Sequence, residues 1–303
     1  MQSTKSLKYN IKKSIDTFYK LIKKIKPKIV LIQGDTTTAA GCAYAGSLYG
    51  SKIAHNEAGL RTFDNNNPYP EELNRKLITS ITDIHFAPTI LNQKNLINEG
   101  IKKDKVFIVG NPGIDSFLYA LKKPSKIAKK VIDHANKENK KIVFLTAHRR
   151  ESIGSNFEIL FRNLEIFFKN NKDYLLVTTK HPNNFALKYI KKYLTNLDNS
   201  LITKPYDYFT TCNIINKSAF VITDSGGIQE ECATVGIPTV VCRKVTERIE
   251  AEKIGIAKIW KNKKDFLCLL KWAKNKKIKK WLKKPYGNGN SAKKISEILI
   301  KNI

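Results

Sequence analysis

One stretch decides the fold of this chain: Val221-Ile222-Thr223-Asp224-Ser225-Gly226-Gly227-Ile228-Gln229-Glu230-Glu231. The apolar residues 219–222 predict a strand, the Ser-Gly-Gly segment predicts a turn, and residues 228–235 predict a helix that ends before Gly236. The first N–H groups of a helix have no partners within the helix, and the helix dipole is positive at this end. A strand, a small-residue turn and a helix start therefore predict an anion-binding site, where glycines let a ligand approach the backbone.

A carboxylate near the start of this helix would suit a nucleotide. Glu230 or Glu231 would reach the ribose hydroxyls while the phosphates lie on the turn. The alternative is a turn without a ligand, in which Asp224 or Ser225 caps the helix. Short motifs of this kind also occur by chance, so the segment alone leaves both interpretations open.

The composition is that of a globular protein from a reducing compartment. The 303 residues suffice for two domains. The five cysteines are scattered, without a C-x-x-C pair or a histidine at zinc spacing, so we expect neither a disulfide framework nor a metal site. No apolar run approaches the roughly 20 residues of a membrane span, and the first residues lack the apolar region of a signal peptide. We therefore expect a cytoplasmic protein.

The net charge of +29 suggests nucleic acid as a partner. However, the lysines are spread over predicted helix faces, without interleaved aromatic residues or a recognisable nucleic-acid-binding module. This pattern is typical of a solvated surface, so we expect neither a nucleic-acid nor a membrane partner. A positive field would still attract an anionic small substrate.

Strands alternate with helices along the whole chain. Apolar runs predict four strands in the first part, at 28–33, 53–55, 84–87 and 105–109, and five in the second, at 142–146, 174–179, 201–203, 219–223 and 239–242. The pattern predicts an α/β fold with two Rossmann-like domains and an interdomain cleft. We place the domains at 1–122 and 123–285, with a C-terminal helix over 286–303 that returns to the first domain. The first domain is expected to lack its first βαβ unit, because its first strand follows a helix.

The chemistry-bearing motifs follow predicted strand ends, where α/β folds bind ligands. They occur in the order Gln33-Gly34-Asp35-Thr36-Thr37-Thr38, His55-Asn56-Glu57-Ala58-Gly59-Leu60-Arg61-Thr62, Pro68-Tyr69-Pro70-Glu71-Glu72-Leu73-Asn74-Arg75, Gly110-Asn111-Pro112, Ala147-His148-Arg149-Arg150-Glu151, Thr223–Glu231 and Thr246-Glu247-Arg248. Together they resemble the non-hydrolysing UDP-N-acetylglucosamine 2-epimerases over nearly the whole chain. The resemblance implies the GT-B-like two-domain fold and the interconversion of UDP-GlcNAc and UDP-ManNAc, by UDP elimination and re-addition through 2-acetamidoglucal. We expect a UDP-sugar substrate, no cofactor and a homodimer.

The resemblance also implies roles for individual residues. Acid–base and sugar contacts fall to Asp35, Glu57 and Glu71, and the diphosphate contact to His148. The nucleotide would be bound by residues of the second domain: phosphate by Ser225, Gly226, Gly227 and Arg248, ribose by Glu231, and uracil near Tyr206.

Structural alternatives exist for these residues. Asp35 could cap a helix, Glu57 could be a turn residue, and Glu71 lies in a helix's first turn, where acids are common. His148 could belong to a structural cluster with the two arginines after it. The other histidines are expected to be structural or on the surface: His55, His85, His134 and His181.

Two departures from the family pattern bear on function. Ala147 stands where a glycine is usual, and the family's opening strand with its glycine-, arginine- and lysine-bearing turn has no counterpart before Gln2. The alternative function is therefore that of a catalytically impaired fragment that binds UDP or a UDP-sugar. A GT-B glycosyltransferase is disfavoured by the three carboxylates, and only charge supports a nucleic-acid-binding protein.

Overall fold

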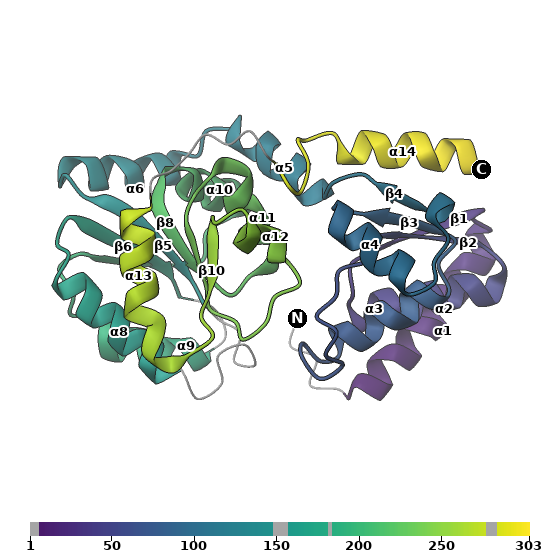
Figure 1. Ribbon diagram of the computed structural model, residues 1–303, viewed down its shortest axis with the longest axis horizontal. Helices are drawn as coiled ribbons and strands as arrows, with labels where there is room; N and C mark the ends of the chain where they lie inside the picture. The colour runs from purple at the N-terminus through teal and green to yellow at the C-terminus, as the bar shows by residue number, and fades with distance from the viewer. Residues whose placement is uncertain (1–5, 148–156, 181–183, 277–283) are drawn as a thin grey trace. The chain divides into compact units, whose positions relative to one another are not determined.

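The computed structural model describes residues 6–147, 157–180, 184–276 and 284–303 (Figure 1). The chain divides into two compact units: the first unit is residues 1–115 with 286–303, and the second unit is residues 116–285. The boundary falls within α5 (Pro112–Leu121), because Phe117 and Ala120 are buried in the core of the second unit. It therefore lies before residue 122, the position that the strand pattern predicted.

The first unit is built on a parallel sheet of four strands in the order β1-β2-β3-β4. These strands are β1 (Ile29–Gln33), β2 (Lys52–Asn56), β3 (Ile84–Ala87) and β4 (Val106–Ile108). One face of the sheet is covered by α1 (Leu7–Ile25), α2 (Thr37–Tyr49) and α3 (Glu71–Ser80), and α14 (Ser291–Asn302) lies on the opposite face (Figure 1). The helix α4 (Ile90–Asn98) packs Leu96 on the ends of β3 and β4, and η1 (Lys103–Lys105) precedes β4.

The C-terminal helix is fixed to the first unit by apolar and polar contacts. Ile295 of α14 packs in one buried cluster with Phe86 and Val109. At the helix start, the Asp115 carboxylate accepts the backbone N–H groups of Ser291 and Ala292 at 3.1 and 2.8 Å. A carboxylate at this end both satisfies unpaired N–H groups and complements the helix dipole.

The second unit has a parallel sheet of six strands in the order β10-β9-β8-β5-β6-β7. These strands are β5 (Lys141–Thr146), β6 (Tyr174–Thr179), β7 (Ser200–Thr203), β8 (Ser218–Thr223), β9 (Thr239–Val241) and β10 (Ala257–Ile259). The expectation of five strands was wrong, because β10 was not predicted. This edge strand has only three residues, and Lys258 at its centre is exposed, so it leaves no apolar run in the sequence.

Helices cover both faces of this second sheet (Figure 1). On one face, α8 (Phe157–Lys169), α9 (Asn184–Tyr189), η3 (Ile190–Leu194) and α13 (Phe266–Asn275) pack around a core rich in phenylalanine. The other face carries α6 (Lys126–Lys137), α10 (Tyr208–Lys217) and α11 (Gly226–Val235). Two short elements complete the unit, α12 (Ile249–Lys253) and η4 (Lys263–Asp265). In the described part of the chain, no helix is both long and apolar enough to cross a membrane.

Candidate functional site

Asp35 and Glu57 follow the ends of neighbouring strands in the first unit. Gln33 of β1 pairs in register with Asn56 of β2, so the residues after both strands lie at one edge of the sheet. Gly34 has φ +70°, and a Cβ atom there would lie 3.1 Å from Oε2 of Glu57. The Glu57 side chain therefore lies against Gly34, next to Asp35, and a larger residue at 34 would displace it.

Glu57 itself has a left-handed backbone with φ 64°. This conformation is strained for a residue other than glycine, and such strain is concentrated at functional sites. Asn111, which is buried after β4, donates from Nδ2 to Oε1 of Glu57 at 3.0 Å. Its own Oδ1 accepts the N–H of Gly113 at 2.9 Å, which fixes the direction of the amide. The Glu57 carboxylate is thus held from the end of a third segment of the sheet.

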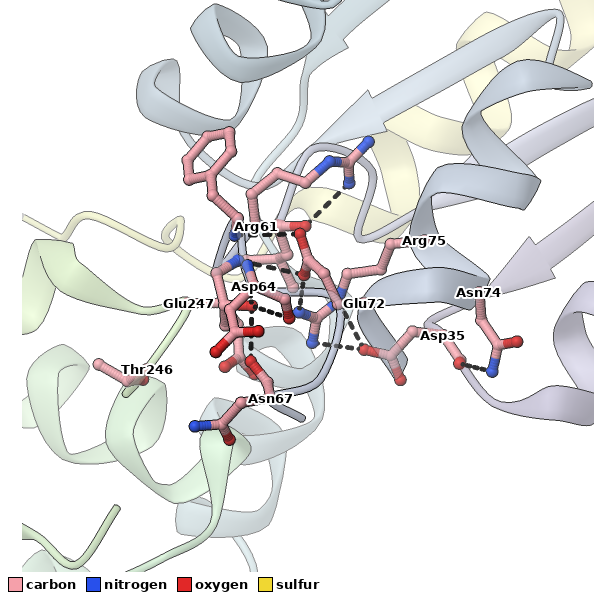
Figure 2. Close-up of polar contacts among 12 residues, drawn as sticks. Asp35, Arg61, Asp64, Asn67, Glu72, Asn74, Arg75, Thr246 and Glu247 are labelled. Atoms are coloured by element: carbon pink, nitrogen blue, oxygen red, sulfur yellow. Dashed lines mark hydrogen bonds and ion pairs between the residues drawn. The ribbon is translucent and has the colours of Figure 1, made fainter. Parts of the chain in front are cut away.

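Asp35 is held by α3, as Figure 2 shows. Arg75 donates to Oδ2 of Asp35 from Nε at 2.9 Å and from Nη2 at 2.6 Å. Asn74 donates to the backbone carbonyl of Asp35 at 2.8 Å. The N-cap of α2 is Thr36, whose hydroxyl accepts the N–H of Ala39 at 3.1 Å. The alternative role of Asp35 as a helix cap is therefore wrong.

The third predicted carboxylate, Glu71, is the first residue of α3. It is half-buried, and no hydrogen bond or ion pair joins its side chain to the described residues. The next residue, Glu72, is fully buried and accepts Nη1 of Arg75 at 2.8 Å. Glu72 also accepts the N–H groups of Thr62 and Phe63 at 3.1 and 3.2 Å, so it anchors the polar loop before α3.

In the second unit, α11 begins at Gly226 rather than at the predicted residue 228, so both glycines lie in its first turn. Ser225 occupies the N-cap position, but its side chain makes no capping hydrogen bond in the described part of the chain. The predicted alternative of a capped turn is therefore wrong for this helix. A Cβ atom on Gly227 would meet no atom of the described residues within 4 Å. These residues therefore leave the N–H groups at the start of α11 uncovered, which is the arrangement that binds phosphate.

The two glutamates of α11 have different partners. Glu230 is buried and accepts Nε of Arg248 at 2.7 Å, and Arg248 also pairs with Glu247. A Cβ atom on Gly226 would lie 2.4 Å from Nη1 of Arg248, so only glycine admits the guanidinium at this point. Arg248 thus lies beside the helix start, but two carboxylates already hold it.

Glu231 accepts the hydroxyl of Tyr208 at 3.0 Å. Its side chain is almost fully buried, and burial raises the pKa of this carboxyl to about 7. A carboxyl with such a pKa beside an anion-binding helix start is a candidate functional group. Tyr208 was not predicted as a site residue, because a tyrosine in a helix start is an ordinary sequence feature.

Two further residues were predicted to belong to the site, Tyr206 and His148. Tyr206 packs against the core cluster on the α6 side of the sheet, and burial raises the pKa of its hydroxyl. It lines an open pocket of about 500 Å³ with Val131, Leu201 and Pro205. His148 lies outside the described residues.

Three residues of the quoted motifs have contacts that the sequence did not predict: Arg75, Asn111 and Glu230. Arg75 lies 40 residues from Asp35, Asn111 54 residues from Glu57, and Glu230 18 residues from Arg248, so only the fold brings these pairs together. In the described part of the chain, no group of three or more His, Cys, Asp or Glu side chains could hold a metal ion.

Comparison with known proteins places the chain in a family. The family model for UDP-N-acetylglucosamine 2-epimerase matches residues 1–300. The chain belongs to this family. A UDP-N-acetylglucosamine 2-epimerase of Campylobacter jejuni is 40% identical over 290 residues, which span 91% of this chain and 76% of that protein.

Two solved structures support the same placement of this 2-epimerase family member. The UDP-GlcNAc 2-epimerase of Neisseria meningitidis bound to UDP-GlcNAc has a TM-score of 0.90 and 32% identity, and the match covers 99% of this chain and 84% of that one. The S. aureus MnaA–UDP co-structure has a TM-score of 0.92 and 32% identity, with 100% and 82% covered. The predicted α/β fold of this GT-B-like family is confirmed, whereas the interdomain cleft and the site roles stay predictions.

Proposed function

We propose that this chain interconverts UDP-GlcNAc and UDP-ManNAc by eliminating UDP and adding it back. One observation carries the proposal: in a member of the 2-epimerase family, two neighbouring strand ends carry Asp35 and Glu57, each held by a buried donor. Inversion at C2 requires that a proton leaves one face of the sugar and returns to the other. Two fixed carboxylates at one sheet edge supply the two groups that this exchange needs.

In the first half-reaction, one carboxylate takes the C2 proton, the electron pair forms the C1–C2 double bond, and the C1–O bond breaks to release UDP. In the second, a carboxylic acid returns a proton to the other face of C2, and a UDP oxygen adds to C1. Because a free carboxylate and a carboxylic acid alternate, neither group is consumed. Asp35 and Glu57 are the proposed pair, and Glu71 is proposed to contact the sugar.

UDP is proposed to bind the second unit at the start of α11. Ser225, Gly226 and Gly227 are proposed to provide backbone N–H groups for phosphate, since Ser225 does not cap this helix with its own side chain. Of the two glutamates that the sequence left open, Glu230 is engaged by Arg248, whereas Glu231 makes its hydrogen bond to the Tyr208 hydroxyl. This difference supports Glu231 as the ribose ligand. Arg248 next to Gly226 and His148 are proposed phosphate contacts, and Tyr206 a neighbour of uracil.

The comparisons do not favour the alternatives of an impaired UDP-binding fragment or a glycosyltransferase, since the Campylobacter jejuni relative and the Neisseria meningitidis structure are 2-epimerases by name. A cytoplasmic location and a homodimer remain parts of this proposal.

Deuterium exchange tests the proposed reaction. The purified protein is incubated with UDP-GlcNAc in D₂O, and proton NMR follows the C2 signal and the appearance of UDP-ManNAc. We expect both sugars to gain deuterium at C2 as they approach equilibrium. Formation of UDP-ManNAc that retains the original C2 proton in D₂O, or no turnover at all, would contradict the proposal.

Gly227→Ala separates UDP binding from stability. A methyl group at this position meets no atom of the described residues within 4 Å, and alanine suits a helix better than glycine. The methyl group would fill the space that a phosphate is proposed to take. We expect an unchanged or slightly higher Tm and a Kd for UDP raised by about tenfold or more, measured by calorimetry. Lys271→Ala, at an exposed position of α13, serves as the control, and unchanged UDP affinity in Gly227→Ala would exclude this phosphate site.

Glu231→Gln should raise stability and lower affinity. Because burial raises the pKa of Glu231 to about 7, its protonated form is favoured in the folded state, and this stabilisation is lost as the pH rises from about 4.5 to 7. Above pH 7 the buried charge lowers the free energy of unfolding by about 3 kcal/mol. The neutral glutamine avoids this loss, and its carbonyl oxygen still accepts the Tyr208 hydroxyl. UDP binding should weaken by about 1–3 kcal/mol through the loss of charge-assisted ribose bonds. Urea unfolding at about pH 8 measures the stability, and calorimetry measures the affinity for UDP. A variant less stable than wild type at that pH would refute the predicted gain in stability.

A further inference from the structure

Arg75 occupies a central position among the charged groups of the first unit (Figure 2). It lies on α3, and its side chain is only 3% exposed. All three of its nitrogen groups are engaged: Nε and Nη2 with Asp35 at 2.9 and 2.6 Å, and Nη1 with Glu72 at 2.8 Å. A guanidinium that is buried and bonded in this way is not placed to bind a diphosphate itself. Its effect on chemistry must pass through the groups that it holds.

The contact with Asp35 is asymmetric. Both nitrogen atoms donate to Oδ2, whereas Oδ1 has no hydrogen-bond partner among the described residues. Two bonds that converge on one oxygen from a planar, rigid donor fix the position of that oxygen. The backbone of Asp35 is fixed too, because Asn74 on the same helix donates to its carbonyl at 2.8 Å. One carboxylate oxygen is thus restrained and the other is left to react.

Glu72 explains why the guanidinium stays in place when Asp35 changes its charge. A buried arginine that loses its only carboxylate partner is strongly destabilising. Glu72, which is fully buried, continues to pair with Nη1 when a proton neutralises Asp35. The same carboxylate accepts the N–H groups of Thr62 and Phe63. Arg75 therefore belongs to a rigid frame that includes the loop before α3.

We infer that Arg75 is a positioning residue for proton transfer at C2: it holds Oδ2 of Asp35, so that Oδ1 is the atom that exchanges the proton. This inference rests on the proposed epimerase function. Since reactions are sensitive to displacements of about 1 Å, a loosened Asp35 should slow the chemical step much more than it weakens substrate binding. A merely structural arginine would instead change stability and leave the rate of the folded enzyme unchanged.

Arg75→Lys is the first test, because lysine keeps the charge but cannot make the two-point contact. We expect kcat and the rate of C2 deuterium exchange to fall by about 10–100-fold, with KM and the Kd for UDP within about twofold of wild type. Arg61→Lys is the matched control. Arg61 is equally buried in the same unit and makes a two-point contact with Glu99 at 2.7 Å, but it does not contact Asp35. This variant should lose stability and keep its kcat.

A double-mutant cycle covers the case in which Arg75→Lys folds poorly. In the Asp35→Asn background, Arg75→Lys should cause no further loss in the C2 exchange rate of the folded fraction, because its effect passes through Asp35. Guanidinium added to Arg75→Ala should restore part of kcat. Equal losses of kcat in Arg75→Lys and Arg61→Lys, full additivity in the cycle, or a rise in KM without a fall in kcat would each overturn the inference. If the wild-type protein shows no C2 exchange, the proposed function fails, and the positioning role falls with it.

Discussion

Glu57→Gln is expected to lower the rate of C2 deuterium exchange by a factor of about 10²–10⁴, the usual contribution of a general acid or base. Glutamine has nearly the shape of glutamate, and its Oε1 still accepts the Asn111 amide that holds Glu57 at 3.0 Å. It cannot take or return a proton. The substitution therefore removes the proposed chemistry with little change in structure, and the Tm should stay close to that of wild type.

The measurement is single-turnover deuterium exchange by NMR, together with the Kd for UDP by calorimetry. UDP binding should be unaffected, because the proposed nucleotide contacts lie in the second unit. Glu297→Gln, on an exposed position of α14, is a control of the same chemical change and should leave all three quantities unchanged. An exchange rate in Glu57→Gln within about threefold of wild type would show that Glu57 does not handle the proton.

The layout of the fold followed from the apolar runs because strands buried on both faces leave uninterrupted apolar segments. Of the strands observed, only β10 was not predicted, since its three residues alternate buried, exposed and buried. Helix starts were harder to predict. Gly226 and Gly227 have low helix propensity and predicted a turn, yet they form the first turn of α11.

The candidate site was predictable in its residue types but not in its internal contacts. Asp35 and Glu57 stand out because each follows a strand end, which is a local property. The donors that hold them are 40 and 54 residues away along the chain. Such pairs depend on strand order and on how α3 lies across the sheet, and no spacing rule in the sequence encodes either. The residue pattern alone left Glu230 and Glu231 open, and the family resemblance favoured Glu231. Their different partners, Arg248 and Tyr208, became known only from the structure.

Two buried histidines should make the first unit acid-labile. His55 and His85 are 1% and 0% exposed and pair in register on β2 and β3. His55 Nε2 donates to the carbonyl of Gly34 at 2.9 Å, and the ring of His85 lies near the backbone of Thr82. Burial, reinforced by nearby cations such as Arg61, lowers the pKa of both rings from 6.5 to about 4. Both rings are therefore neutral in the folded state at neutral pH.

The sign of the pH effect follows from which state binds more protons. Between about pH 6.5 and 4 the unfolded chain protonates these histidines and the folded chain does not, so stability falls as the pH falls through this window. Each histidine should account for a loss of about 3 kcal/mol, and the loss should level off below pH 4. Since a whole domain is stable by only about 5–15 kcal/mol, the first unit should be close to unfolding near pH 4.

The second unit provides an internal reference for this measurement. Trp260 and Trp272, the tryptophans of the described residues, both belong to the second unit, so their emission follows this unit, whereas circular dichroism follows both. In urea titrations between pH 7.5 and 4.5, unfolding of the first unit should appear as a transition in circular dichroism without a change in tryptophan emission. We expect the midpoint of this transition to move to a lower urea concentration as the pH falls. The double variant His55→Gln/His85→Gln should abolish this movement, whereas His134→Gln, at an exposed position of α6, should not. A circular-dichroism transition that keeps its urea midpoint over this pH range would refute the acid-lability. An equally strong response to His134→Gln and to the double variant would also refute it, because only rings buried in their neutral form bind protons on unfolding.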